Sequence, residues 1–404
     1  MDPHPDGFCA FQQDGMYEEG GKTKFAFRKG QVYSRHGTSS EPCNQADLLG
    51  IIEGKVEEAK ESLRAEHTDQ LAALVNRLQT AQTLATAPAS TLSWTMDEET
   101  FVAIIIEQIR RDDPIPLRLL LRRMESDAAR LVSEGEEAEL ETLLDRLACL
   151  TANFVLMERD DLFRQVIRGL VSIYNLGFDA RGMTRRDVPI PAARLWLLVI
   201  ERVMAIGLVL VREERWELAR DLTLQRGKGI EFTQRRITYV TWIRHATTEA
   251  SRGGEFVHVV DEQRTDKSLL WMVQELVQQS DCLRQGLAAD DERILDSLCQ
   301  FDMLAMLSTL AEAARIGDFN LASRTHHYYP HFSRFYESRS LPMLEMVIAD
   351  PALREQVFPG RSDEELAAAT RWINHAATQE GFRYAGWDGV LSDRVAHFLQ
   401  QHPE

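Results

Sequence analysis

Helical periodicity constrains this chain more than any other feature. From Trp94 to the C-terminus almost every segment has the pattern of a helix, and alternation typical of a strand is confined to one short candidate, Phe256–Val260. Helices joined by short turns are expected to pack as antiparallel pairs. We therefore predict a mainly α protein, with an irregular α-solenoid or helical bundle over 94–404 that could divide near 180–190 or 253–266.

Capping residues set the expected ends of several helices. The acidic run at 97–99 opens a helix that runs to about Arg111 and is stopped by Asp113-Pro114, and Gly177 is a natural C-terminal cap. The further predicted helices cover 117–132, 136–157, 160–176, 191–212, 214–226, 233–251, 267–285, 290–316, 318–329, 342–348, 363–380 and 392–401.

A long amphipathic helix is predicted over 47–86, with Asp47 as its N-cap. Its apolar residues fall at heptad spacing, with a change of phase near Glu66-His67. The helix either forms an inter-chain coiled coil, which would make it a segment for self-association or a protein partner, or packs on its own domain. A linker by composition follows it, so the second part of the chain spans 47–93. The heptad residues are Leu49, Ile52, Val56, Ala59, Leu63, Leu71, Leu74, Leu78, Ala81 and Ala85.

Residues 22–36 have the pattern of a β-hairpin. Two phenylalanines alternate with other residue types, as in a half-buried strand. Lys29-Gly30 would form the turn, because glycine takes a positive φ without steric cost. Residues 32–35 would then be the return strand.

This hairpin is also basic. Five basic residues and no acidic residue lie between Lys22 and His36, although the net charge of the chain is −17. The following turn, 37–40, offers backbone N–H and hydroxyl groups suited to a phosphate oxygen. A solvated basic hairpin with an ordinary turn is the alternative. The predicted nucleic-acid-binding residues are Lys24, Arg28, Lys29, Arg35, His36, Gly37, Thr38 and Ser39.

The end of the hairpin resembles a known motif. It is similar to the aromatic–x–Arg–x–Gly–Ser/Thr–Ser turn that closes the AlbA-like DNA-binding domain of Schlafen-type and many bacterial proteins. The resemblance covers residues 5–50, about one eighth of the chain. It implies association with DNA or RNA and, more distantly, a bacterial regulatory or phage-defence role. The matching residues are Tyr33, Arg35, His36, Gly37, Thr38, Ser39 and Ser40.

Only the second half of that domain is matched. In the family, the first half carries the early strands, a helix and the acidic residues that hold the metal of Schlafen-type nucleases. Here Met1 lies just before the matched half, so we expect a partial hairpin module over 1–46, either truncated or completed by a partner chain. Because adjacent carboxylates are needed to hold a catalytic metal, we predict no catalytic residues, no metal, no cofactor and no metal-dependent cleavage.

Net charge, cysteine spacing and hydropathy limit the partners and the compartment that we expect for this protein. An acidic chain confines any nucleic-acid contact to a local patch. Five cysteines without paired spacing suit a reducing cytoplasm better than a disulfide framework or a zinc site. No signal peptide is recognised. The longest apolar run, Leu195–Val211, contains Glu201-Arg202, and each charge would cost about 2.5–3.5 kcal/mol in a bilayer centre. We therefore expect a cytoplasmic protein with a buried helix here and no membrane partner.

Two sets of aromatic and histidine residues favour packing over chemistry. Trp242 and His245 lie three residues apart and share a helix face. His327 and His331 have the spacing of helical metal ligands, but Pro330 lies between them and no acidic ligand adjoins. We expect both sets to belong to the packed helical domain.

Catalytic signatures are not recognised in this sequence: it has no phosphate loop, dinucleotide fingerprint, nucleophile elbow or HExxH motif. Two functional hypotheses remain. The first is a non-catalytic, nucleic-acid-associated protein whose basic hairpin contacts phosphate and whose helical region binds protein partners. The alternative is a helical scaffold or adaptor without nucleic-acid binding, whose N-terminal hairpin completes the sheet of a partner.

Overall fold

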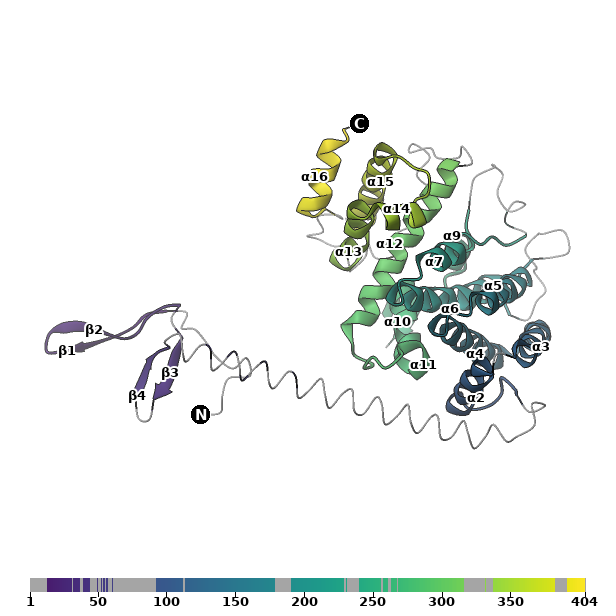
Figure 1. The fold of residues 1–404 in the computed structure, drawn as a ribbon, viewed down its shortest axis with the longest axis horizontal. Helices are drawn as coiled ribbons and strands as arrows, with labels where there is room; N and C mark the ends of the chain where they lie inside the picture. The colour runs from purple at the N-terminus through teal and green to yellow at the C-terminus, as the bar shows by residue number, and fades with distance from the viewer. Residues whose placement is uncertain are drawn as a thin grey trace. The chain divides into compact units, whose positions relative to one another are not determined.

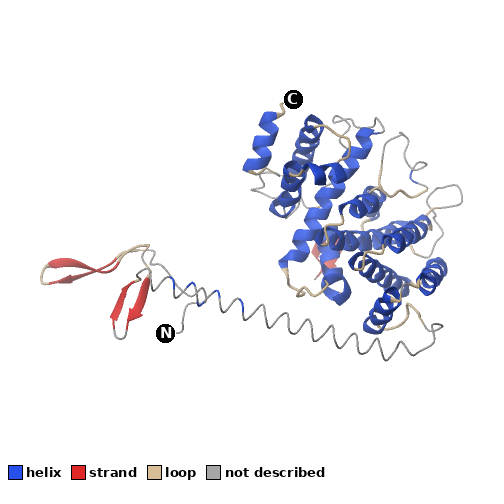
Figure 2. Ribbon diagram, in the orientation of Figure 1, coloured by secondary structure: helices blue, strands red, loops and turns tan. Residues whose placement is uncertain are grey.

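The predicted mainly helical fold is confirmed. In the computed structural model, the described residues form fourteen helices and three two-stranded antiparallel sheets (Figure 2). The chain divides into two units, Met1–Leu78 and Gln79–Glu404. The predicted subdivision of the helical region stays a prediction. The structure describes residues 13–30, 32–36, 39–43, 49, 52, 54, 56, 60, 92–111, 113–178, 190–228, 230, 240–255, 257–260, 263–266, 268–315, 331, 337–381 and 391–403.

The N-terminal unit contains two hairpins rather than the single one predicted. Strands β1 (Gly15–Glu19) and β2 (Lys22–Phe27) pair with each other, and β3 (Tyr33–His36) pairs with β4 (Ser39–Pro42). The expected pairing of the 22–27 strand with 32–35 is therefore wrong, although both strands form.

Glycine geometry explains this difference. Gly20 and Gly21 both have positive φ, 62° and 74°, which a two-residue hairpin turn of the favoured twist requires. This turn directs β2 back onto β1. Gly30 also has a positive φ, 76°, as predicted, but the strands on its two sides pair elsewhere. The ring of Phe27 lies over Gly15, where a Cβ would collide with it.

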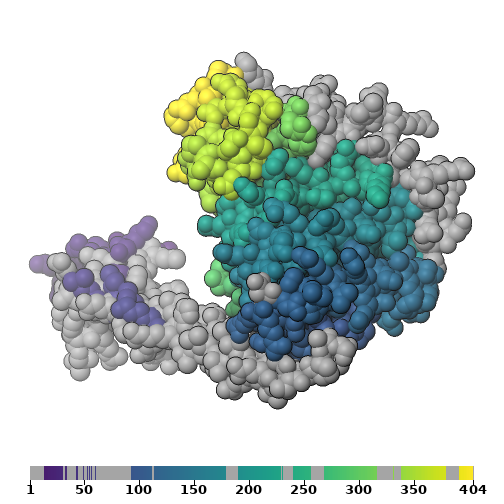
Figure 3. Space-filling model, turned by 45° about the vertical axis from the view of Figure 1, so that its right-hand side comes forward, coloured from purple at the N-terminus to yellow at the C-terminus, as the bar shows by residue number. Residues whose placement is uncertain are grey.

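The helical unit is built from helices joined mostly by short connections. The helices α2 to α5 lie at one end of this unit and α13 to α16 at the other (Figures 1 and 3). A hairpin of β5 (Val257–Val260), which confirms the one predicted strand, and β6 (Gln263–Asp266) separates α9 from α10. The helices are α2 Glu98–Arg110, α3 Pro114–Glu134, α4 Glu137–Leu156, α5 Asp160–Asn175, α6 Ala192–Arg212, α7 Trp216–Thr223, α9 Trp242–Gly253, α10 Leu269–Gln279, α11 Asp281–Arg284, α12 Glu292–Arg315, α13 Glu337–Ala349, α14 Pro351–Val357, α15 Asp363–Gly381 and α16 Asp393–Gln401.

Local capping chemistry sets several helix ends. Asp97 caps α2 by accepting a hydrogen bond from the Thr100 backbone N at 2.9 Å, as its position in the sequence predicts. The predicted helix 267–285 is instead broken at Ser280, whose extended backbone ends α10. The hydroxyl oxygen of Ser280 accepts from the Leu283 backbone N at 3.3 Å and so starts α11.

Helix α6 is the centre of the helical unit. It contacts α4, α9, α10 and α12, and every residue from Leu195 to Val211 is buried, as predicted for a core helix. The two charged residues within it are paired: Arg202 donates to Asp145 of α4 at 2.9 Å and to Glu201 at 2.8 Å. Burial of these charges is tolerable because each has an opposite partner.

Helix α12 is long and apolar enough to cross a membrane by length and composition, the only helix of the described residues with that property. Most of its apolar window is buried inside the helical unit. Its apolar residues are therefore already covered by the other helices.

A close approach joins α6 to α12. A Cβ built on Gly207 of α6 would overlap the ring of Phe301 on α12, and both residues are fully enclosed. Gly207 lies in a helix interior, where glycine is less favourable than alanine by about 1 kcal/mol. The absence of a side chain at this position is therefore required by packing and not by helix propensity.

We predict that Gly207→Ala destabilises the protein by about 1–3 kcal/mol, because a methyl group at this position forces the Phe301 ring to move within a packed core. Chemical denaturation monitored by circular dichroism measures the change. Gly169→Ala in α5 is the matched control, since its Cβ would meet only the flexible Glu125 carboxylate, 2.8 Å away. Equal effects of the two substitutions would contradict the role of Gly207.

Candidate functional site

Three of the predicted nucleic-acid-binding residues lie in or directly after β2, and all three are exposed. Lys24 forms an ion pair with Glu19 across the hairpin, with 2.6 Å between Nζ and Oε2. Arg28 lies over the ring of Phe25, 5.2 Å from its centroid. The backbone N of Lys29 donates to Asp14 Oδ1 at 2.6 Å. Arg28 and Lys29 thus occupy a connection whose backbone is anchored, while Lys24 already has an acidic partner.

Three more of these residues lie at the end of the second hairpin. Arg35 and His36 end β3, and Ser39 begins β4, with His36 opposite Ser39 and Arg35 opposite Ser40. This register leaves two residues, 37 and 38, between the strands. Gly37 and Thr38, the predicted turn residues, lie outside the described residues. The backbone register thus places Arg35, His36 and Ser39 at one hairpin end, and their role in binding stays a prediction.

Acidic residues offset much of the predicted positive charge. Glu18 and Glu19 lie on β1, directly beside the basic strand β2, and Asp14 contacts the backbone of Lys29. From residue 14 to residue 41 the chain has five basic and four acidic residues. The count over 22–36 alone therefore overstated the local charge, because strand pairing adds acids from outside that stretch.

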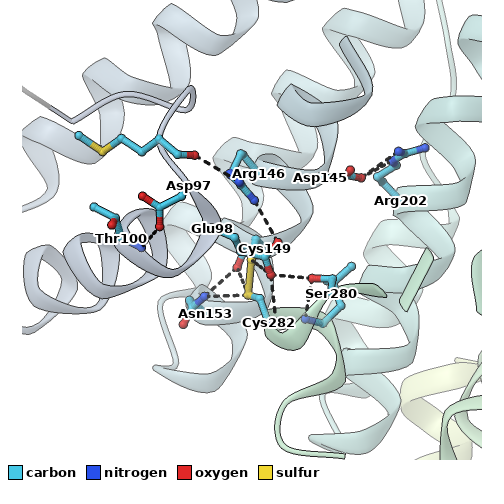
Figure 4. A network of polar contacts seen from close by, with 12 residues as sticks. Asp97, Glu98, Thr100, Asp145, Arg146, Cys149, Asn153, Arg202, Ser280 and Cys282 are labelled. Carbon is cyan, nitrogen blue, oxygen red and sulfur yellow. Dashed lines mark hydrogen bonds and ion pairs between the residues drawn. A yellow bond between two sulfur atoms is a disulfide. The ribbon is translucent and has the colours of Figure 1, made fainter. Parts of the chain in front are cut away.

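In the helical unit, Glu98 joins three segments through a polar cluster (Figure 4). Its carboxylate accepts hydrogen bonds from Arg146 Nη1 of α4 at 3.0 Å, from the Ser280 hydroxyl at 3.0 Å and from the Cys282 backbone N at 3.4 Å. The cap at Asp97 fixes the start of α2 beside it, and the hydrogen bond from the Thr100 backbone lowers the pKa of Asp97. Glu98 therefore holds the first turn of α2 against α4 and α11.

A disulfide lies within this cluster. Cys149 of α4 and Cys282 of α11 are bonded, with 5.6 Å between their Cα atoms and 133 residues between them in the sequence. The expectation that scattered spacing argues against a disulfide is therefore corrected for this pair. Spacing cannot reveal a bridge between residues brought together only by folding.

The neighbouring ion pair of Asp145 and Arg202 completes the α4–α6 contact (Figure 4). Burial raises the pKa of Asp145, although the Arg202 guanidinium acts in the opposite direction. Burial likewise raises the pKa of Glu201. Desolvation outweighs the attraction at both carboxylates. Because Arg202 would be left buried without a partner if the helices shifted, these ion pairs favour one arrangement of α4 against α6.

His331 has an acidic partner that the sequence did not reveal. Its Nδ1 lies 2.7 Å from Asp302 Oδ1 of α12, and its backbone N donates to Asp302 Oδ2 at 2.8 Å. His327 lies outside the described residues. No group of three or more metal-binding side chains occurs among the described residues. The polar packing role predicted for His331 fits this geometry.

The same histidine faces a hydroxyl, which raises the question of nucleophilic chemistry. Thr247 Oγ1 lies 3.4 Å from His331 Nε2, so that Thr247, His331 and Asp302 form a row. However, the Thr247 hydroxyl donates to the Ile243 carbonyl O at 2.6 Å, so its proton is not directed at the histidine. All three residues are buried. The row therefore links α9 and α12 through His331.

Trp242 and His245 lie in the core, as predicted. The hydroxyl of Tyr174 is 2.6 Å from His245 Nδ1 and donates to the Trp242 carbonyl O at 3.1 Å. Among the described residues, His245 Nε2 has no hydrogen-bond partner. The ring of Trp196 packs edge-on at a centroid distance of 4.5 Å. Burial in this aromatic setting lowers the pKa of His245 to about 4.

The chain matches no protein-family model, no curated protein and no solved structure. The resemblance to the AlbA-like domain therefore stays a prediction that rests on the residues of the second hairpin.

We predict that the free energy of unfolding decreases as the pH is lowered, because His245 becomes protonated in the unfolded chain before it does in the folded protein. A depressed pKa means that the unfolded chain binds the proton first, so stability is unaffected above about pH 6.5. Between pH 6.5 and pH 4 the free energy of unfolding decreases progressively, by up to about 3 kcal/mol. Urea unfolding at a series of pH values measures this loss.

His245→Phe should remove that loss between pH 6.5 and 4.5, since Tyr174 can still donate to the Trp242 carbonyl. His397→Gln is the control, because His397 is exposed on α16. If wild type and His245→Phe show the same pH dependence, His245 is not the responsible group.

Proposed function

We propose that this protein associates with nucleic acid without catalysing a reaction. The contact is the end of the β3–β4 hairpin together with the connection between β2 and β3. The observation that carries the proposal is the register of β3 and β4, in which His36 opposes Ser39. That register is compatible with a tight turn at the position of the family motif.

The residue types at this hairpin end suit phosphate. Arginine, serine and backbone N–H groups are among the donors that bind phosphate oxygens, and such contacts position a nucleic acid without reading its sequence. Arg35 and Ser39 come from adjacent strands and lie within one residue pair of each other in the register. The proposal therefore predicts binding with little sequence preference.

Arg28 and Lys29 extend the contact beyond the turn. The backbone N of Arg28 donates to the Tyr33 hydroxyl at 3.0 Å, which ties this connection to the first residue of β3. Both side chains are exposed. Lys24 contributes less to the proposed contact, because its ammonium group is already paired with Glu19.

We predict that replacing Arg28, Lys29 and Arg35 with alanine weakens binding of labelled DNA and RNA. If each contacts one phosphate of a duplex, the slope of log K against log salt should fall by about 2–3 in magnitude. Electrophoretic mobility or fluorescence anisotropy over a salt series measures both quantities.

The matched control replaces three exposed arginines of α3, namely Arg118, Arg122 and Arg130, with alanine. This control changes the net charge by the same amount, so it separates a local contact from general electrostatics. Unchanged affinity and slope in the hairpin variant, or equal changes in both variants, would rule the hairpin out as the contact.

Self-association as a helical scaffold is a second candidate function, favoured by one observation. Leu49, Ile52 and Val56 are helical and follow each other at steps of three and four residues, on one side of the helix. Their exposed fractions are 50 %, 55 % and 46 %. Such a stripe of half-exposed apolar residues suits the seam of a coiled coil with a second copy. Leu74 and Leu78, predicted to continue it, lie outside the described residues.

We predict that Ile52→Gln combined with Val56→Gln converts the assembly to single chains of 46.1 kDa, because the seam loses its apolar contacts. Light scattering after size exclusion measures the mass. Gly54→Gln is the control, since position 54 is helical, exposed and has no atom within 4 Å of its Cβ site. A wild-type protein that is already a single chain would remove this candidate.

A further inference from the structure

We propose that Cys149 and Cys282 form a reversible redox site in the helical unit. In the oxidised state the disulfide locks α11 onto α4, and a dithiol reductant of the thioredoxin or dithiothreitol class opens it. This inference is independent of nucleic-acid binding and of self-association.

The two cysteines of the disulfide differ in exposure, which decides where an attacking thiolate is expected to react. Cys149 is buried in α4, with 1 % of its surface exposed. Cys282 is only partly buried, on the short helix α11, and exposed residues Asp281 and Gln279 lie near it in the chain. Exchange depends on access to the attacked sulfur. Attack is therefore directed at Cys282 Sγ, and Cys149 is the leaving group.

The chemical step balances as follows. A thiolate of the reductant bonds to Cys282 Sγ, the disulfide bond breaks, and Cys149 leaves as a thiolate that takes a proton from solvent. The second thiolate of the reductant then attacks the reductant sulfur that is bonded to Cys282. This step breaks the mixed disulfide, and Cys282 leaves as a thiolate that is protonated by solvent. Two electrons and two protons pass to the protein, and the reductant becomes a disulfide.

The site offers hydrogen-bond partners to both thiols of the reduced state. Cys282 Sγ lies 3.4 Å from the Cys149 carbonyl O, and Cys149 Sγ lies 3.9 Å from Glu98 Oε1. Asn153 Nδ2 lies 3.3 Å from Cys282 Sγ and can donate to it in either state. Both thiols thus have acceptors without any large movement.

Opening the bond changes how α11 is held. The disulfide is its only covalent tie to α4, across 133 residues of chain. Without it, the segment is held by the buried side chain of Leu283 and by hydrogen bonds. Ser280 and Cys282 donate to Glu98, and Arg212 Nη1 of α6 donates to the Arg284 carbonyl O at 2.8 Å. Reduction is therefore expected to loosen the contact of α11 with α4 and α6.

The two other described cysteines are not part of a disulfide. Cys299 is buried in α12, and burial raises the pKa of its thiol well above the ordinary value, which disfavours the reactive thiolate. Cys43 is free and half-buried in the N-terminal unit. It serves as the control position for thiol substitution.

The test uses the full-length protein oxidised with diamide and then treated with dithiothreitol under native conditions. Mass spectrometry after alkylation should show two more labels on the reduced protein than on the oxidised protein, at Cys149 and Cys282. Reduction should lower the melting temperature by about 5–10 °C, because a cross-link over a long loop is lost. Renewed diamide treatment should restore it.

Cys149→Ser combined with Cys282→Ser should melt at the same temperature with and without dithiothreitol, while Cys43→Ser should respond as the wild type does. Three results would overturn the proposal. The disulfide does not form under diamide, it opens only in denaturant, or the double serine variant shows the same shift on reduction.

Discussion

The contact of α6 with α12 is the constraint on which the helical unit depends. Gly207 lets the ring of Phe301 reach the backbone of α6, and both helices are buried along most of their length. Since α6 also contacts α4, α9 and α10, a shift at this crossing would be passed to each of them. Packed interiors have few voids to absorb such a shift, so the position of one helix fixes the others.

Buried and partly buried polar groups determine how the remaining segments attach to this core. Glu98 binds Ser280 and Cys282, Asp302 binds His331, and Tyr174 lies against His245. A buried polar group without a partner costs about 1–3 kcal/mol, so each pair favours one arrangement of its two segments over alternatives. The same pairing argues against catalysis at Thr247, whose hydroxyl proton is already used. The cluster around Glu98 combines such pairing with a disulfide, one of whose cysteines, Cys282, is only partly buried.

The N-terminal unit, unlike the helical unit, leaves several of its apolar side chains exposed. Met16 and Phe25 oppose each other on the β1–β2 hairpin with 61 % and 49 % of their surfaces exposed, and Leu49, Ile52 and Val56 are similarly uncovered. A two-stranded hairpin is marginally stable alone in water. Both proposed functions of this unit, phosphate contact and self-association, therefore use surface that the unit itself does not bury. Pairing of Lys24 with Glu19 limits how much of the basic charge remains for phosphate.

The sequence by itself determined the features that arise within a few residues of one another. Helical periodicity, the N-cap at Asp97 and the buried run Leu195–Val211 were all predictable, because capping and amphipathicity are local properties. The tertiary structure alone decided that Cys149 meets Cys282 and that Asp302 meets His331. These partners lie 133 and 29 residues apart, and their contact depends on how whole helices pack. No spacing rule encodes that packing, because it results from the fit of many side chains at once.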